Sequence, residues 1–283
     1  MKLTPISEVI PQKNIVILSP HYDDVLFMLG GYISELEKIN LLRTKSFYIK
    51  LIFSKSNYQA REGKANFDTS KKRIQHATGV RLIEDLACND ELLGAFEYYY
   101  ELLGEKECFV RGKSPADSEM EFPHGMYADF NEKDNAIFGR MKHRIERYAQ
   151  QDDTAIVFPM AIKEHIDHFI VREAGIEVAK NLGAKAKAAF YFQEDKPYGG
   201  IATEEELQRM ETFIKTNELR STYYTYDPEK VVALAFEHYP SQVEEVYRKG
   251  VLNRAKFWQD ELKSANGVDR ICKYVYNNAD MLF

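Results

Sequence analysis

Two short clusters of polar residues contain the groups that could do chemistry in this chain of 283 residues. The first is Ser19-Pro20-His21-Tyr22-Asp23-Asp24, and the second is His165-Ile166-Asp167-His168. Each cluster follows an apolar run typical of a buried strand, and ligands collect at the carboxyl ends of strands in an open α/β sheet. Imidazole and carboxylate bind borderline divalent metals and also transfer protons. Together the two clusters predict a metal site with an acid/base pair.

The number and spacing of these groups match a catalytic metal site. A catalytic zinc site takes three protein ligands and leaves one position for water, and His21, Asp24 and His168 supply that number. Side chains at adjacent positions cannot point the same way, so we expect Asp23 and Asp24 to have different roles. One would bind the metal, and the other would face the open coordination position.

The second cluster suits a helical turn. His165 and His168 are three residues apart and would share one helix face. Asp167 would lie on the flank, where it could orient a neighbouring imidazole. Either cluster alone has a purely structural alternative, because Asp-Asp often marks a turn or a helix start. The presence of both clusters, each after a buried-type strand, favours the functional interpretation.

The remaining sequence predicts the elements that position the clusters. Continuous apolar runs indicate strands, and apolar residues at helical spacing indicate helices. We expect strands over 14–18, 47–53, 80–86, 155–159, 186–192 and 223–226. We expect helices over 25–38, 69–78 (ended by Gly79), 134–150, 167–181, 203–216 and within 228–262. This alternation is typical of an α/β fold with a doubly wound, mostly parallel sheet.

The length of the chain suits one large α/β domain with accessory segments. Periodicity fades over 98–135, which we interpret as an insertion over the site or, alternatively, as a surface loop without a role. Residues 217–283 are expected to form a C-terminal extension packed on the core. The predicted organisation is therefore a single domain over 1–283.

The composition narrows the class of protein. A formal net charge of −6 argues against a nucleic-acid-binding surface, which normally carries excess Lys and Arg. Cys88, Cys108 and Cys272 are odd in number and lack metal-like spacing, so we expect reduced thiols. The first residues lack the apolar core of a secretory signal, and no apolar stretch is long enough to span a bilayer. We expect a cytoplasmic protein, as a monomer or a homo-oligomer.

Four motifs together resemble a known family. The first cluster resembles the His-Pro-Asp-Asp-Glu signature, and the second resembles the His-Pro-Asp-His signature, of the PIG-L/LmbE-like metal-dependent de-N-acetylases. These enzymes are related to N-acetylglucosaminyl-phosphatidylinositol deacetylase. Weaker matches at 191–198 and 239–243 follow in the right order. Tyr22 and Ile166 replace the prolines of the two signatures, and Val25 replaces the closing acidic residue. For the arginine that the family often carries in the helix after the second strand, Arg73 is the nearest candidate.

The resemblance implies a Rossmann-like three-layer αβα sandwich and a hydrolase that removes an N-acetyl group from an amino sugar or its conjugate. It implies that His21, Asp24 and His168 hold Zn²⁺, with Fe²⁺ accepted by the same ligands. Asp23 would take a proton from the attacking water. His165, as an imidazolium oriented by Asp167, would stabilise the oxyanion and protonate the departing amine.

Further residues are candidates for contact with an N-acetylated sugar. Asp90 corresponds to a family position near substrate hydroxyls, with a helix N-cap as the alternative. Tyr198 and Gln242 are candidates for lining the pocket, and His124 is a candidate from the predicted insertion. Two other functions remain as alternatives. One is a non-haem Fe(II) oxygenase that uses His21-x-Asp23 and a distal His, usually on a jelly roll. The other is a non-catalytic carbohydrate-binding protein of the same fold.

Overall fold

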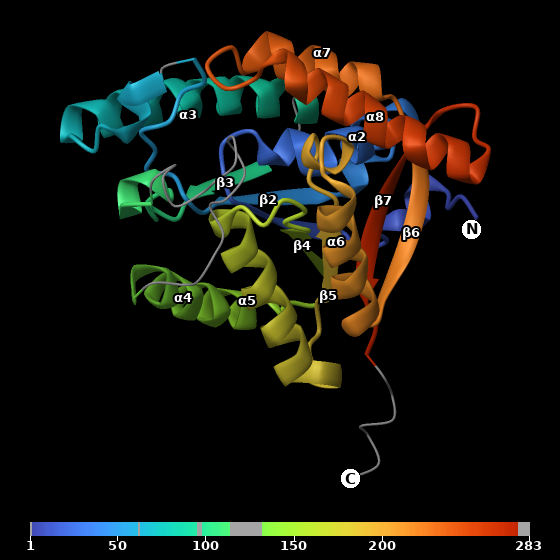
Figure 1. Cartoon of the computed structure of the whole chain (residues 1–283). Coiled ribbons are helices and arrows are strands. Elements are labelled where there is room, and N and C mark those ends of the chain that lie inside the picture. The colour runs from blue at the N-terminus through green and yellow to red at the C-terminus, as the bar shows by residue number, and fades with distance from the viewer. Residues whose placement is uncertain (1, 62, 95–97, 114–131, 277–283) are drawn as a thin grey trace.

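A seven-stranded sheet forms the centre of the computed structural model, which describes residues 2–61, 63–94, 98–113 and 132–276 (Figure 1). The strands are β1 (Asn14–Ser19), β2 (Ser46–Leu51), β3 (Tyr98–Leu102), β4 (Thr154–Pro159), β5 (Ala189–Gln193), β6 (Leu219–Tyr226) and β7 (Gly267–Tyr274). Their order is β3-β2-β1-β4-β5-β7-β6. The strands from β3 to β5 in this order pair in parallel with one another, and β7 runs antiparallel to both β5 and β6.

Helices cover both faces of this sheet (Figure 1). On one face lie α2 (Asp24–Lys38), α3 (Lys71–Leu93), α7 (Pro228–His238) and α8 (Glu245–Leu262). On the other lie α4 (Glu132–Tyr148), α5 (Ile166–Leu182) and α6 (Glu204–Thr216). The short α1 (Ile6–Val9) packs beside α2 and β6. This arrangement confirms the predicted three-layer αβα sandwich.

Strand β1 lies inside the sheet, between β2 and β4, and this position explains why its sequence is continuously apolar. Ile15 and Ile17 belong to the core cluster on one face of the sheet, whereas Val16 and Leu18 belong to the cluster on the other. A parallel strand covered on both faces has no position for a polar side chain until it ends. The first polar cluster therefore begins where β1 stops.

The prediction of a helix ending at Gly79 and a strand over 80–86 was wrong. Helix α3 runs without interruption through both segments, and the next strand is β3. A Cβ at Gly79 would meet nothing within 4 Å, so this glycine lies in open space, where it weakens a helix by only about 1 kcal/mol. The buried face of α3 carries the charged residues Arg81, Glu84 and Asp85, whereas Ile83 is 72% exposed. The helical period was hidden because polar side chains occupy half of the buried positions of α3.

The C-terminal part of the chain contributes two strands to the same sheet. Strand β6 was predicted over its second half, but β7 was missed, and its buried positions include Asp269 and Arg270. The helical region predicted within 228–262 is two helices, α7 and α8. The single-domain organisation with an insertion over 98–135 stays a prediction, although residues 98–102 of that segment form β3.

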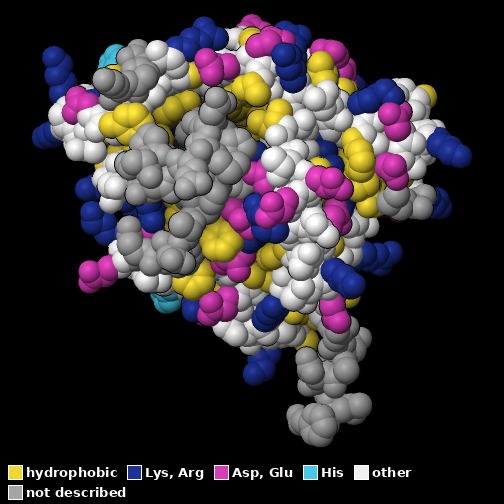
Figure 2. Space-filling model, in the orientation of Figure 1, with side chains coloured by type: hydrophobic (Ala, Val, Ile, Leu, Met, Phe, Trp, Pro, Cys, Tyr) yellow, Lys and Arg dark blue, Asp and Glu magenta, His cyan; other side chains and the backbone are white. Residues whose placement is uncertain are grey.

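The described helices include none that is both long and apolar enough to cross a membrane. Figure 2 shows one face of the molecule, on which basic and acidic side chains are interspersed among the described residues.

Candidate metal and catalytic site

The two polar clusters meet at the carboxyl edge of the sheet. Strands β1 and β4 are hydrogen-bonded neighbours, so the segments that leave their ends lie side by side. Asp23 is the N-cap residue of α2, and His165 is the N-cap residue of α5. The strand-to-helix transitions predicted from the sequence are therefore what bring the clusters together.

Three atoms from the clusters form a triangle of the size that one cation needs. His21 Nδ1 lies 3.2 Å from His168 Nε2 and 3.5 Å from Asp24 Oδ2. His168 Nε2 lies 3.3 Å from the same Asp24 oxygen. A tetrahedral zinc ion with ligands at about 2.0–2.1 Å holds its donor atoms about 3.3 Å apart. The donor set and its spacing fit a divalent cation.

The second nitrogen of each of these imidazoles is held by a carboxylate. His21 Nε2 lies 3.0 Å from Asp167 Oδ2, and His168 Nδ1 lies 3.2 Å from Asp195 Oδ2. An ionised carboxylate only accepts hydrogen bonds, so these nitrogens carry the protons. The lone pairs of neutral rings are thereby left on His21 Nδ1 and His168 Nε2, which are the two atoms of the triangle. This is the arrangement of metal-binding histidines.

His165 lies close by but has the opposite tautomer. Its Nδ1 accepts the backbone N–H of Asp167 at 3.3 Å, which caps α5. The proton of the neutral ring is therefore on Nε2, which lies 3.8 Å from Cys108 Sγ. His165 has ligand atoms near those of His21 and His168, and also near those of Cys108 and Asp167. A protonated nitrogen cannot bind a cation, so the geometry favours His165 as a hydrogen-bond donor.

The pKa values of His21, His168 and Asp24 are shifted because these groups lie close to groups of opposite charge. Burial by itself lowers the pKa of His21, but hydrogen bonds to Asp167 and Asp24 raise it to about 9. Burial likewise opposes the charge of His168, but Asp24 and Asp195 raise its pKa well above the usual range. Burial would raise the pKa of Asp24, but His168 and His21 hold it well below its usual range. Without a cation, the carboxylates of Asp24, Asp167 and Asp195 stabilise the protonated rings of His21 and His168.

Asp23 and His165 have pKa values suited to other roles. Burial, followed by repulsion from Asp24, raises the pKa of Asp23 to about 6. Asp23 can therefore gain and lose a proton near neutral pH. Burial, together with repulsion from His21, lowers the pKa of His165 well below its usual range, so this ring is neutral.

This finding corrects the expected imidazolium at His165. A charged ring would carry a proton on Nδ1, where the backbone N–H of Asp167 already points. The carboxylate of Asp167 is also not placed as expected. Its oxygens receive His21 Nε2, the backbone N–H of Cys108 and Arg111 Nη1. Asp167 therefore orients the imidazole of His21.

A pocket lies beside the triangle. Three of its lining residues belong to the clusters: His21, Asp23 and His165. The others are Tyr58, Arg81, Glu107, Cys108, Phe109, Tyr198, Gln242 and Tyr247. The structure thus places the predicted residues Tyr198 and Gln242 at the pocket, together with several residues that the sequence did not reveal.

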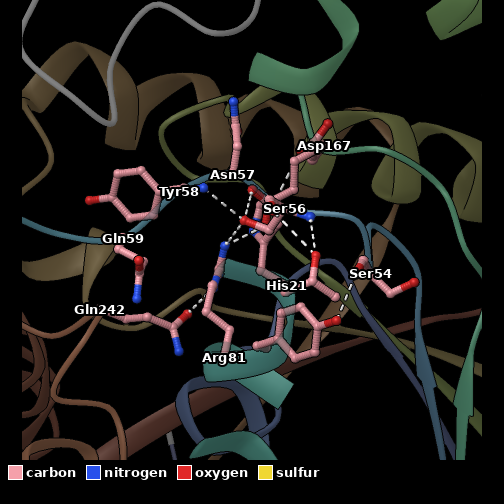
Figure 3. Close-up of polar contacts among 12 residues, drawn as sticks. His21, Ser54, Ser56, Asn57, Tyr58, Gln59, Arg81, Asp167 and Gln242 are labelled. Atoms are coloured by element: carbon pink, nitrogen blue, oxygen red, sulfur yellow. Dashed lines mark hydrogen bonds and ion pairs between the residues drawn. The ribbon is translucent and has the colours of Figure 1, made fainter. Parts of the chain in front are cut away.

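Arg81 lines the pocket and was not expected there from the sequence. Its Nε donates to Gln242 Oε1 at 2.6 Å, and its Nη1 donates to Ser56 Oγ at 2.7 Å and forms an ion pair with Glu107 (Figure 3). Arg73, the residue favoured from the sequence, instead donates to the backbone oxygen of Asn57 and so supports a loop. Recognition of α3 as one long helix would have revealed Arg81, because its buried face includes this residue.

One predicted substrate contact is not among the described residues that line the pocket. Asp90 lies in the last turn of α3, where it accepts a hydrogen bond from Tyr98 at 2.6 Å, and it is not among the lining residues. It was expected there because 80–86 was interpreted as a strand. His124 lies outside the described residues.

Comparisons with known proteins agree on the fold. No family model matches the sequence, and no curated protein matches it. A deacetylase in complex with teicoplanin, from the teicoplanin biosynthesis pathway, is similar over 94% of this chain and 99% of its own, with 16% identity and a TM-score of 0.60. The zinc-inhibited form of a teicoplanin deacetylase is similar over the same shares, with 15% identity and a TM-score of 0.59. A deacetylase of the pseudoaglycone of the antimicrobial reagent A40926 is similar over 95% of this chain and 99% of its own, with 15% identity and a TM-score of 0.58.

The chain therefore has the α/β fold that these deacetylases share. At this level of identity the likeness establishes the fold alone, because one fold can carry many activities.

Proposed function

We propose that this protein is a metal-dependent hydrolase that removes the acetyl group from an N-acetylated amino sugar or its conjugate. One observation carries the proposal: His21 Nδ1, Asp24 Oδ2 and His168 Nε2 form a cation-sized triangle, and each imidazole is backed by a carboxylate. Asp23 and His165 stand beside that triangle at the pocket. The shared fold of the deacetylases supports this assignment.

His21, Asp24 and His168 would hold the cation, which we assign as Zn²⁺. Neutral imidazole and carboxylate suit zinc and also accept Fe²⁺. The zinc-inhibited form of a neighbour supports access of zinc to this fold. The bound cation would lower the pKa of a water molecule and polarise the acetamide carbonyl.

The side chains at the pocket would carry the proton transfers. The oxygen of the attacking water bonds to the acetamide carbon, and Asp23 accepts the proton that this water loses. The Nε2–H of His165 donates to the oxyanion that develops on the carbonyl oxygen. The C–N bond then breaks, and Asp23 returns its proton to the departing amine. A pKa of about 6 lets one carboxyl group do both steps. The products are acetate and a free amine.

The pocket walls suit a sugar. Tyr58, Phe109, Tyr198 and Tyr247 place aromatic rings around the polar groups. Aromatic faces pack well against the C–H faces of a pyranose, while Arg81 and Gln242 offer polar groups for its hydroxyls. The fold does not favour the oxygenase alternative, which usually sits on a jelly roll. Nothing in the site favours a non-catalytic role.

The cytoplasm remains the proposed location. Cys88, Cys108 and Cys272 are free and buried, which suits a reducing compartment. We also retain the proposal of one domain over 1–283.

Amine release from a panel of acetamido sugars tests the proposed function. The zinc-loaded protein should release one amine per acetate from at least one member of the panel, and removal of the cation with a chelator should stop the reaction. Failure of the zinc-loaded protein on every acetamido sugar, with one cation bound per chain, would overturn the proposal.

A further inference from the structure

The buried carboxylate of Asp167 connects the proposed ligand His21 to the guanidinium of Arg111. Its Oδ2 receives His21 Nε2 at 3.0 Å and the backbone N–H of Cys108 at 3.1 Å. Its Oδ1 receives Arg111 Nη1 at 2.6 Å. Both oxygens are therefore engaged, and the carboxylate cannot rotate without breaking one of these bonds.

Arg111 links this carboxylate to a second one. Its Nε donates to Asp134 Oδ1 at 2.8 Å, and Asp134 lies in the first turn of α4. Nη1 of Arg111 also donates to the backbone oxygen of Lys106 at 2.7 Å. The guanidinium lies over Phe53, at 5.1 Å from its ring centre, and the Phe53 ring in turn lies 6.1 Å from that of His21. A continuous series of hydrogen bonds thus runs from Asp134 through Arg111 and Asp167 to His21.

Stability does not explain why a guanidinium is buried here. Buried ion pairs contribute little net stability, because the loss of hydration offsets the attraction between the charges. Arg111 is fully buried, and its Nη2 has no hydrogen-bond partner within the part of the chain that the structure describes. An unpartnered buried donor costs free energy, so the geometry that Arg111 imposes has to serve another purpose.

We propose that Arg111 is a positioning residue of the cation site. By holding Oδ1 of Asp167, it keeps Oδ2 on Nε2 of His21, and so keeps Nδ1 of that ring directed at the cation. Asp134 holds the guanidinium from its other side. The inference rests on the proposed function, because it assumes that His21 is a ligand. It adds a contact from a segment distant in sequence from both polar clusters.

Cation affinity in the absence of substrate tests this role. Competition with a chromophoric chelator gives the dissociation constant for Zn²⁺, and the visible spectrum of the cobalt-loaded protein reports the ligand geometry. Loss of a residue that orients a ligand typically weakens metal binding about 10–100-fold. We expect that loss, with an altered cobalt spectrum, in Arg111→Gln. Arg111→Lys should recover part of the affinity, because an ammonium can still reach Asp167.

Arg270→Gln is the matched control. The side chains of Arg270 and Arg111 are each 2% exposed, and Arg270 also joins two carboxylates, those of Glu194 and Glu211. It should keep the wild-type zinc affinity and cobalt spectrum. If Arg111→Gln does not fold, Asp134→Asn replaces it, with a smaller loss of affinity expected because the guanidinium keeps its bond to Asp167.

The outcomes separate this inference from the proposed function. Wild-type affinity and spectrum in the Arg111 variant, or in Asp134→Asn where it replaces that variant, would overturn the inference. An equal loss in Arg270→Gln would also overturn it, because the effect would then be general destabilisation. A wild-type protein that binds zinc tightly but releases no amine would overturn the proposed function and leave the role of Arg111 standing.

Discussion

Asp195 holds His168 from behind: its Oδ2 lies 3.2 Å from His168 Nδ1, while its Oδ1 accepts the backbone N–H of Met160 at 2.6 Å. The carboxylate comes from the end of β5, the imidazole from α5 and the amide from the end of β4. Three elements therefore meet at one side chain, and the ring is fixed with Nε2 toward the triangle. This relationship makes Asp195 part of the proposed cation site, although it is not among the residues that line the pocket.

Asp195→Asn should weaken zinc binding. The amide that replaces the carboxylate is uncharged and can turn its NH₂ group toward the ring, so the proton on His168 Nδ1 is no longer favoured. We expect a loss of about 10–100-fold in zinc affinity with little change in shape. Competition with a chelator measures it. Unchanged affinity would show that Asp195 does not control the tautomer of His168.

Asp23→Asn should abolish most of the activity without loss of the cation. The substitution removes the group that accepts and returns the proton, which is typically worth about 10²–10⁴ in rate. Asp24 and the two imidazoles keep their positions, so zinc content should stay at the wild-type level. Amine release at saturating substrate, normalised to bound zinc, gives the result. Wild-type turnover with zinc retained would remove Asp23 from the mechanism.

Zinc binding should release protons. The pKa of His21 is about 9, and that of His168 is also well above the usual range, so both metal-free rings are charged at pH 7. The cation must displace one proton from each ring, so about two protons should leave per cation at pH 7. Affinity should rise with pH at least through the pKa of His21, which is about 9. Titration calorimetry in buffers of different ionisation enthalpy measures the release, and binding without proton release would contradict the assigned ligands.

Asp85 should make the stability of the metal-free protein depend on pH. Burial raises its pKa from 3.8 to about 8, despite hydrogen bonds from Tyr100 and Tyr239. Between these values the unfolded chain loses the proton and the folded protein keeps it. Stability should therefore fall as pH rises, by up to about 1.4 kcal/mol per pH unit. Asp85→Asn should remove this part of the slope. Denaturant unfolding at several pH values tests it, and equal slopes in both proteins would contradict the shift.

The sequence predicted the position of the two polar clusters best, because each follows a strand that is buried by helices on both faces of the sheet. Strand β1 is apolar because it is covered on both faces, and the polar residues after it had to lie at the edge of the sheet. The cluster from His165 to His168 follows β4 for the same reason. The ligand set that we propose could therefore be inferred from position and residue type, with the family resemblance assigning the roles.

The contacts that tune the site were not predictable in this way. Asp195 follows β5, but no local pattern connects it to His168, since their contact depends on sheet order. Arg81 was hidden because α3 buries charged residues on the face where apolar ones were sought. The neutral state of His165 depends on burial and on repulsion from His21, and its tautomer depends on one backbone N–H at the start of α5. Each of these features arises from tertiary contacts between elements rather than from spacing along the chain.

Zinc content and amine release in two histidine variants, His165→Ala and His168→Ala, test the assignment of the site. We expect His165→Ala to keep one zinc per chain and to lose about 10²-fold or more in turnover, because it removes only the donor to the oxyanion. We expect His168→Ala to lose the zinc. Loss of zinc from His165→Ala, with zinc retained in His168→Ala, would contradict the assignment of the two histidines and with it the proposed mechanism.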